Sequence, residues 1–252
     1  MATPSTAVGG SPAYPRAFRP SFFFWMTVVM AVFVFGGFGM TYLFPLASGT
    51  LRPAPPVVHL HGIVFMSWMI LLLVQPALIG YRNVALHRSL GTFGIAVGTG
   101  VIFTGGLITI VGMGHANPSA PFFYDLMYLS LLAIGGFAVL FTLAIRHVRD
   151  PENHRRLILF ATIPLLPPGI NRTYQVLGQL DYLPVLATYL TMAIIAAAIV
   201  VQDWRAHGGK LTFASKIGAA VVFGQELLHL PITRSHAFAE VASFVQSLAR
   251  YP

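Results

Sequence analysis

The chain is organised around long apolar runs that contain very few charged side chains. The clearest begins at Val57 and ends at about Tyr81, and it reads VVHLHGIVFMSWMILLLVQPALIGY. A helix needs about 20 such residues to cross the hydrocarbon core of a bilayer. This run therefore predicts a membrane-spanning helix with His59 and His61 at its entrance. His87 follows shortly after its exit, at the opposite membrane face.

The composition extends this prediction to the whole chain. Of its 252 residues 56% are apolar and only 9% are charged, whereas about a quarter of the residues in soluble domains are charged. We expect an all-α integral membrane bundle of about seven transmembrane helices. The predicted spans are Phe22–Phe44, Val57–Tyr81, Thr92–Met113, Phe122–Ile145, Leu157–Ile170, Leu183–Gln202 and Phe213–Leu230.

Three regions follow from these spans. Residues 1–20 are predicted to be a flexible cytoplasmic segment, because they are rich in Pro, Ala and Ser. Residues 21–231 form a single transmembrane domain, and residues 232–252 a short amphipathic tail. The first apolar run is too long for the apolar part of a signal peptide, so we expect it to be retained as a span.

The fifth predicted span contains an irregularity. Pro164, Pro167 and Pro168 interrupt it, and proline removes a helical hydrogen bond. In a membrane, broken backbone is tolerated where it is buried in protein or lines a cavity. A kinked helix followed by a plain loop is an equally good interpretation.

The basic residues predict the orientation. With the N-terminus inside, eleven of the fifteen Arg and Lys residues fall in inner loops, as the positive-inside rule requires. They are Arg16, Arg19, Arg82, Arg88, Arg146, Arg149, Arg155, Arg156, Arg205, Lys210 and Lys216. We expect a bacterial cytoplasmic (inner) membrane protein with its C-terminus outside. Because these cations are scattered between apolar runs, the net charge of +8 does not indicate nucleic acid as a partner.

Two acidic residues, Asp125 and Glu226, fall inside predicted spans. An ionisable side chain there costs at least ~2.5 kcal/mol on insertion scales, so each is interpreted as functional. The other five acids are predicted to lie in loops or in the tail.

Histidines lie at depths similar to those of these acids. Counted from the outer-face prolines, His61 and Glu226 are roughly 7 Å deep, and His59 and His229 lie nearer the surface. Glu226-x-x-His229 places both side chains on one helical face. A metal site is predicted in the outer half, with ligands drawn from His59, His61, Asp125, Glu226 and His229. A simple Glu–His hydrogen bond remains the alternative.

Haem b is the other cofactor considered. It needs two axial imidazoles at equal depth on different spans. The candidate pairs are His61 with His229 in the outer half and His87 with His154 in the inner half. Contact with lipid headgroups is the alternative role for the inner histidines. The chain has no Cys, which excludes thiolate metal sites and iron–sulfur clusters.

These residues predict a membrane protein that binds haem or a non-haem metal ion (Fe, Cu or Zn) and serves redox chemistry or electron transfer. If it is an enzyme, it is a membrane-bound oxidoreductase, with a quinone or another small molecule as substrate. One alternative is a proton-coupled or ion-conducting carrier that uses Asp125 and Glu226. A second is a non-catalytic subunit or assembly factor of a larger membrane complex.

Several motifs carry a resemblance. The segments G-F-G-M-T-Y from Gly37, H-L-H-G-I-V-F-M-S-W from His59, L-H-R-S-L-G from Leu86 and N-H-R-R-L-I-L-F-A-T from Asn153 occur in this order. The chain resembles a family of bacterial multi-pass membrane proteins marked by H-x-H-G and L-H-R-x-L-G, a resemblance that implies no particular activity. The likeness to cytochrome b561-type haem bundles is architectural only.

Overall fold

The computed structural model describes residues 17–114, 116–180 and 184–249, and every regular element within these ranges is a helix. The all-α prediction is therefore confirmed for the described residues. The elements are α1 (Phe22–Phe38), the π-helix η1 (Gly39–Leu43), α2 (Phe44–Ala47), α3 (Pro56–Gly80), α4 (Val84–Gly114), α5 (Phe123–Arg146), α6 (Pro151–Thr162), the 3-10 helix η2 (Ile163–Leu165), α7 (Pro167–Gly178), α8 (Val185–Ala206), α9 (Phe213–Thr233) and α10 (His236–Ala249).

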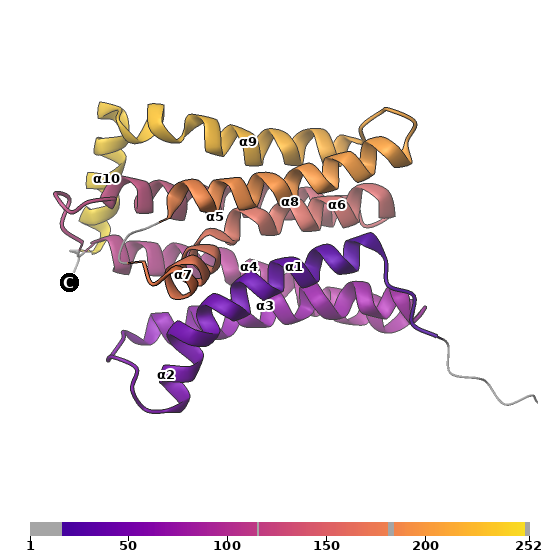
Figure 1. The fold of residues 1–252 in the computed structure, drawn as a ribbon, viewed down its shortest axis with the longest axis horizontal. Helices are drawn as coiled ribbons and strands as arrows, with labels where there is room; N and C mark the ends of the chain where they lie inside the picture. The colour runs from indigo at the N-terminus through magenta and orange to yellow at the C-terminus, as the bar shows by residue number, and fades with distance from the viewer. Residues whose placement is uncertain (1–16, 115, 181–183, 250–252) are drawn as a thin grey trace, which may run out of the picture.

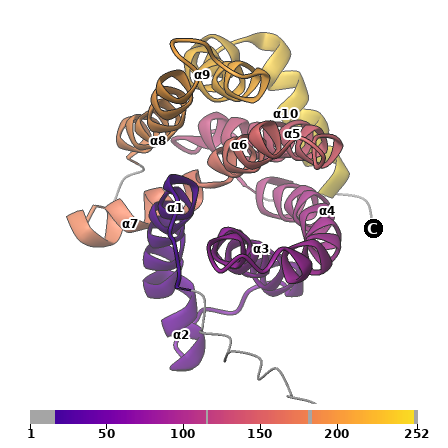
Figure 2. The same cartoon turned by 90° about the vertical axis from the view of Figure 1, so that its right-hand side faces the viewer.

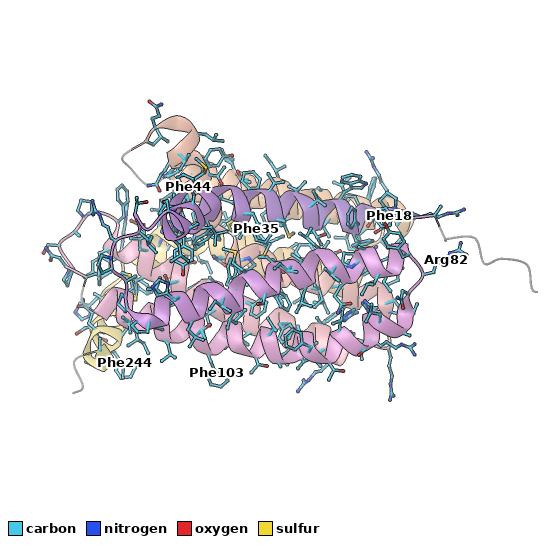
Figure 3. The ribbon with its side chains drawn as sticks, turned by 90° about the horizontal axis from the view of Figure 1, so that it is seen from below. Phe18, Phe35, Phe44, Arg82, Phe103 and Phe244 are labelled. Atoms are coloured by element: carbon cyan, nitrogen blue, oxygen red, sulfur yellow. The ribbon has the colours of Figure 1, made fainter. Side chains whose placement is uncertain are left out.

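The long helices run side by side along one axis (Figure 1), whereas α10 lies across one end of the bundle. Helix α3 packs on α4, α4 on α5, α5 on α6, and α9 on both α6 and α8. Viewed along the bundle, α3 and α9 lie on opposite sides, with α5 and α6 between them (Figure 2). The end that carries Arg82 (Figure 3), where α6 and α9 begin and α8 ends, is called the basic end below.

Five helical segments are long and apolar enough to cross a membrane by length and composition. They are Phe22–Ala47, Pro56–Gly80, Val84–Gly114, Phe123–Arg146 and Val185–Ala206. Large apolar side chains on them point outward, among them Ile63, Phe103 and Leu186, which are 67%, 70% and 72% exposed. A water-facing surface would penalise this exposure, but lipid does not. The chain is thus built as a multi-pass membrane protein.

Side chains fix where several helices begin. Ser21, Asp150 and Thr212 accept hydrogen bonds from the backbone N–H groups of Phe24, Asn153 and Ser215, respectively. Such caps satisfy donors that have no partner within the helix.

Helix α4 begins earlier than the sequence suggested. Asn83 accepts a hydrogen bond from the backbone N–H of Leu86 at 3.2 Å, so the helix starts at Val84 rather than near Thr92. His87 consequently lies in the first turn of a helix and not in a loop.

The fifth predicted span is broken, as its prolines indicate. Pro164 lies in η2, and Pro167 and Pro168 form the first turn of α7. Nearly every residue from Arg156 to Pro167 is buried. The irregular backbone therefore lies inside the protein, where a membrane protein tolerates it.

Helices α1 and α7 approach closely at a glycine. A Cβ atom added at Gly37 would lie 2.3 Å from the carbonyl oxygen of Gly169, whereas one added at Gly36 would meet its nearest atom, Oγ1 of Thr173, at 3.7 Å. Of these two glycines, only Gly37 has no space for a side chain.

We predict that Gly37→Ala lowers the stability of the protein by about 1–3 kcal/mol, because backbone atoms must move to admit the methyl group. Gly36→Ala is the matched control, since both substitutions carry the same gain in helix propensity. Thermal unfolding in detergent should show a lower Tm for Gly37→Ala than for Gly36→Ala. Equal Tm values would contradict the close packing of α1 on α7.

Candidate functional site

Asp125 and His229 lie in direct contact at the end of the bundle opposite the basic end. Asp125 lies in the first turn of α5 and His229 near the end of α9. The Nε2 atom of His229 is 2.7 Å from Oδ1 of Asp125, and the imidazole side chain is only 6% exposed. At this distance each side chain strongly influences the charge of the other.

Two tyrosines enclose the imidazole of His229. The rings of Tyr128 on α5 and Tyr189 on α8 lie 5.1 and 5.3 Å from it, centroid to centroid. The hydroxyl of Tyr128 donates to the backbone carbonyl of Gln225 at 2.6 Å. Three helices thus contribute to one polar centre.

Several buried polar atoms around this pair have no hydrogen-bond partner among the described residues. They are the hydroxyl of Tyr189, both side-chain polar atoms of Gln225 and one carboxylate oxygen of Glu226. Tyr189 lies within electrostatic range of Tyr128, Glu226 and Asp125. We call these six residues, Asp125, Tyr128, Tyr189, Gln225, Glu226 and His229, the Asp–His cluster. Buried polar atoms are nearly always hydrogen-bonded, so their concentration here marks a place that binds water, protons or a polar ligand.

His61 lies elsewhere, on α3. Its Nδ1 atom is 3.1 Å from the hydroxyl oxygen of Thr104, which itself donates to the carbonyl of Gly100. Because the Thr104 hydroxyl already donates its proton to Gly100, Nδ1 of His61 must carry the hydrogen and donate to the hydroxyl oxygen. Nε2 of His61 therefore keeps its lone pair. Since α3 and α9 lie on opposite sides of the bundle (Figure 2), the structure does not bring His61 to His229.

His59 pairs with a tyrosine from the π-helix η1. The hydroxyl of Tyr42 is 2.7 Å from Nδ1 of His59. The ring of Tyr42 also lies beside the glycine of the H-x-H-G motif, since a Cβ at Gly62 would contact the Tyr42 hydroxyl at 3.4 Å.

The expected metal ligands do not assemble. Among the described residues, no three or more His, Asp or Glu side chains are grouped so that they could hold a metal ion. Of the five predicted ligands, the structure joins Asp125 to His229 and leaves His59 and His61 with partners of their own.

The two inner histidines lie at the basic end. His154 donates from Nδ1 to the carbonyl of Ala144 at 2.9 Å, which leaves its Nε2 as an acceptor. His87 contacts the side chain of Gln75, whose amide nitrogen donates to Nδ1 of His87 while its oxygen accepts from the N–H of Gly91. His87 and His154 are close enough for their charges to interact.

Sequence reasoning missed a buried ionic network at the basic end. Asp203, predicted to lie in a loop, is fully buried within α8, and its Oδ1 atom is 2.8 Å from Nε of Arg156, which is also fully buried. The second carboxylate oxygen of Asp203 accepts from the backbone N–H and the hydroxyl of Thr212. Hydropathy gave no indication of this ion pair, because Arg156 lies just before one predicted apolar span and Asp203 just after another.

The sequence also gave little indication of the tyrosines in the Asp–His cluster. Tyr128 lies three residues after Asp125, and Gln225 four residues before His229, so helical spacing places each on the same face as its partner. Tyr189 comes from a helix whose position could not be inferred.

Comparisons with protein-family models, with curated proteins and with solved structures find no significant match to the chain. The site is therefore interpreted from its own geometry.

The basic end also predicts a pH dependence of stability. Glu152 accepts from Arg155 and Arg156. Its partial burial opposes ionisation, but these hydrogen bonds and the charge of Arg155 outweigh it and lower the pKa of Glu152 below the usual value of 4.5. The stabilising contribution of the carboxylate is therefore complete above the unfolded pKa and is lost as the pH falls through the folded one.

We predict that Glu152→Gln lowers Tm in detergent at pH 7 and makes Tm less sensitive to acidification below about pH 5. Glu240→Gln is the control, because Glu240 is 72% exposed and contacts only His236, at 3.4 Å. It should follow the wild-type curve. An acid sensitivity of Glu152→Gln equal to that of the wild type would show that this carboxylate does not stabilise the fold.

Proposed function

We propose that this chain is a proton-coupled carrier or a proton channel whose Asp–His cluster takes up and passes on protons. The observation that carries the proposal is the close approach of the partly buried Asp125 to the buried His229, beside polar atoms that have no hydrogen-bond partner among the described residues. Ionisable residues inside membrane bundles typically serve as proton relays or line ion pathways.

The proposal includes an arrangement in the membrane. The five apolar helical segments, the broken segment α6–η2–α7 and helix α9 make about seven crossings. The excess of Arg and Lys at the basic end favours that end as the cytoplasmic one in a bacterial inner membrane. The Asp–His cluster then lies in the outer half, where protons enter from the outer side.

The cluster contains the groups that such a transfer needs. Oδ1 of Asp125 lies 2.7 Å from Nε2 of His229, so a proton gained by His229 is stabilised by the carboxylate. One carboxylate oxygen of Glu226 has no hydrogen-bond partner among the described residues. The hydroxyl of Tyr189 can both accept and donate a proton, and it lies within electrostatic range of both carboxylates. In this proposal a proton passes from the Asp–His pair to Glu226 by way of the Tyr189 hydroxyl or of water beside it.

We predict that Asp125→Asn and Glu226→Gln each reduce proton flux at least ten-fold, because an amide does not titrate near neutral pH. The amides keep hydrogen-bonding capacity, so helical content and Tm should change little. The measurement is the dissipation of a pH gradient in proteoliposomes, followed with an enclosed pH-sensitive dye. Glu240→Gln, on the exposed face of α10, should match the wild type. Wild-type flux in both cluster variants, or no flux in the wild type, would refute the proposal.

Haem-based electron transfer is the second candidate function. The observation that favours it is the tautomer of two histidines. His61 and His154 each direct Nδ1 towards an internal acceptor, which leaves Nε2 free. Histidines that bind a metal or haem iron typically have their second nitrogen fixed in this way. A haem would supply one-electron chemistry, with a quinone as a suitable membrane-soluble partner.

The haem function is tested by the absorbance of the purified protein. A Soret band that is lost in His154→Ala or His61→Ala, while the exposed His236→Ala keeps it, would support this function and identify the axial ligand. An intact protein that shows no Soret band and contains no iron would exclude it.

A further inference from the structure

A groove lies at the basic end between the start of α1 and the end of α8. Its volume is about 570 Å³, and it is lined by Phe22, Ala198, Val201, Gln202, Arg205 and Ala206. Four of these six side chains are apolar, and the groove is separate from the Asp–His cluster at the other end of the bundle.

The polar groups of the groove are hydrogen-bond donors without an acidic partner. Arg205 is exposed, and no carboxylate lies within 4 Å of it among the described residues. The side-chain oxygen of Gln202 accepts from Arg156 at 3.3 Å, so its amide N–H groups remain available. A guanidinium beside an amide donor is suited to a phosphate group.

The rest of the groove is suited to a hydrocarbon chain. Ala198 lies seven residues before Arg205 on α8, so the apolar wall extends roughly 10 Å from the charged group into the body of the bundle. Trp25 and Trp204 are 55% and 53% exposed near the same end. Exposed tryptophans mark the level of the membrane interface, and the groove therefore begins where lipid headgroups lie.

We propose that this groove binds an anionic phospholipid, with the headgroup phosphate on Arg205 and Gln202 and an acyl chain along Val201 and Ala198. The described residues of the lining include no carboxylate, so none of them matches the cation of a choline headgroup. The charge of the site therefore selects a lipid with a net negative charge, such as phosphatidylglycerol.

The test is native mass spectrometry of the delipidated full-length protein titrated with phosphatidylglycerol. Arg205→Gln should weaken binding at least ten-fold, because Arg205 is the only cation among the described residues that line the groove. Lys210→Gln is the matched control: it removes one charge from the same end outside the groove, and it should bind like the wild type. Equal effects of the two substitutions would overturn the proposal.

Two further measurements separate the headgroup from the chain. Val201→Trp fills the groove without changing its charge and should also weaken binding, whereas wild-type affinity in this variant would contradict a lipid seated in the groove. Phosphatidylcholine should bind at least ten-fold more weakly than phosphatidylglycerol, and inorganic phosphate should not displace the lipid at equal concentration. Equal binding of both lipids, or displacement by phosphate, would refute an anionic-lipid site.

Discussion

The ion pair between Arg156 and Asp203 fixes one end of the bundle. Without its partner, either charge would cost several kcal/mol in this buried position, so α6 and α8 must meet where the pair forms. Asp203 also holds Thr212, and Asn153 of α6 accepts from the backbone N–H of Ala214. These bonds fix the start of α9, and the length of that helix then places His229 at the opposite end.

Much of the fold could be predicted because the membrane restricts what the chain can do. The apolar runs correspond to helices, and the prolines of the fifth run interrupt it as expected. The start of α4 was predicted too late because hydropathy falls at Leu86-His87-Arg88, although Asn83 caps a helix there. Asp203 was assigned to a loop for a related reason: a charged residue at the end of an apolar run gives no indication whether a buried partner exists.

Several residues of the candidate site could be predicted from the sequence, but the contacts between them could not. Asp125 and Glu226 were identified because charges are rare inside spans, and His229 because it follows Glu226 by three residues. Depth grouped His59, His61, Asp125, Glu226 and His229 in one outer layer, but counting along a helix does not show which helices are neighbours. The structure places α5 and α8 beside α9, and it is this adjacency that brings Asp125 and two tyrosines to His229.

Helix α10 ties the Asp–His cluster to a second apolar core. Its Phe238 packs on Tyr128 of the cluster. Phe238, Ala242 and Val245 of α10 are buried together with Phe123, Met127 and Tyr128 of α5. Gln246 adds hydrogen bonds to the carbonyls of Met113 and Ala116. Loosening α10 would therefore expose the apolar side of Tyr128, so the order of this terminal helix and the order of the cluster depend on each other.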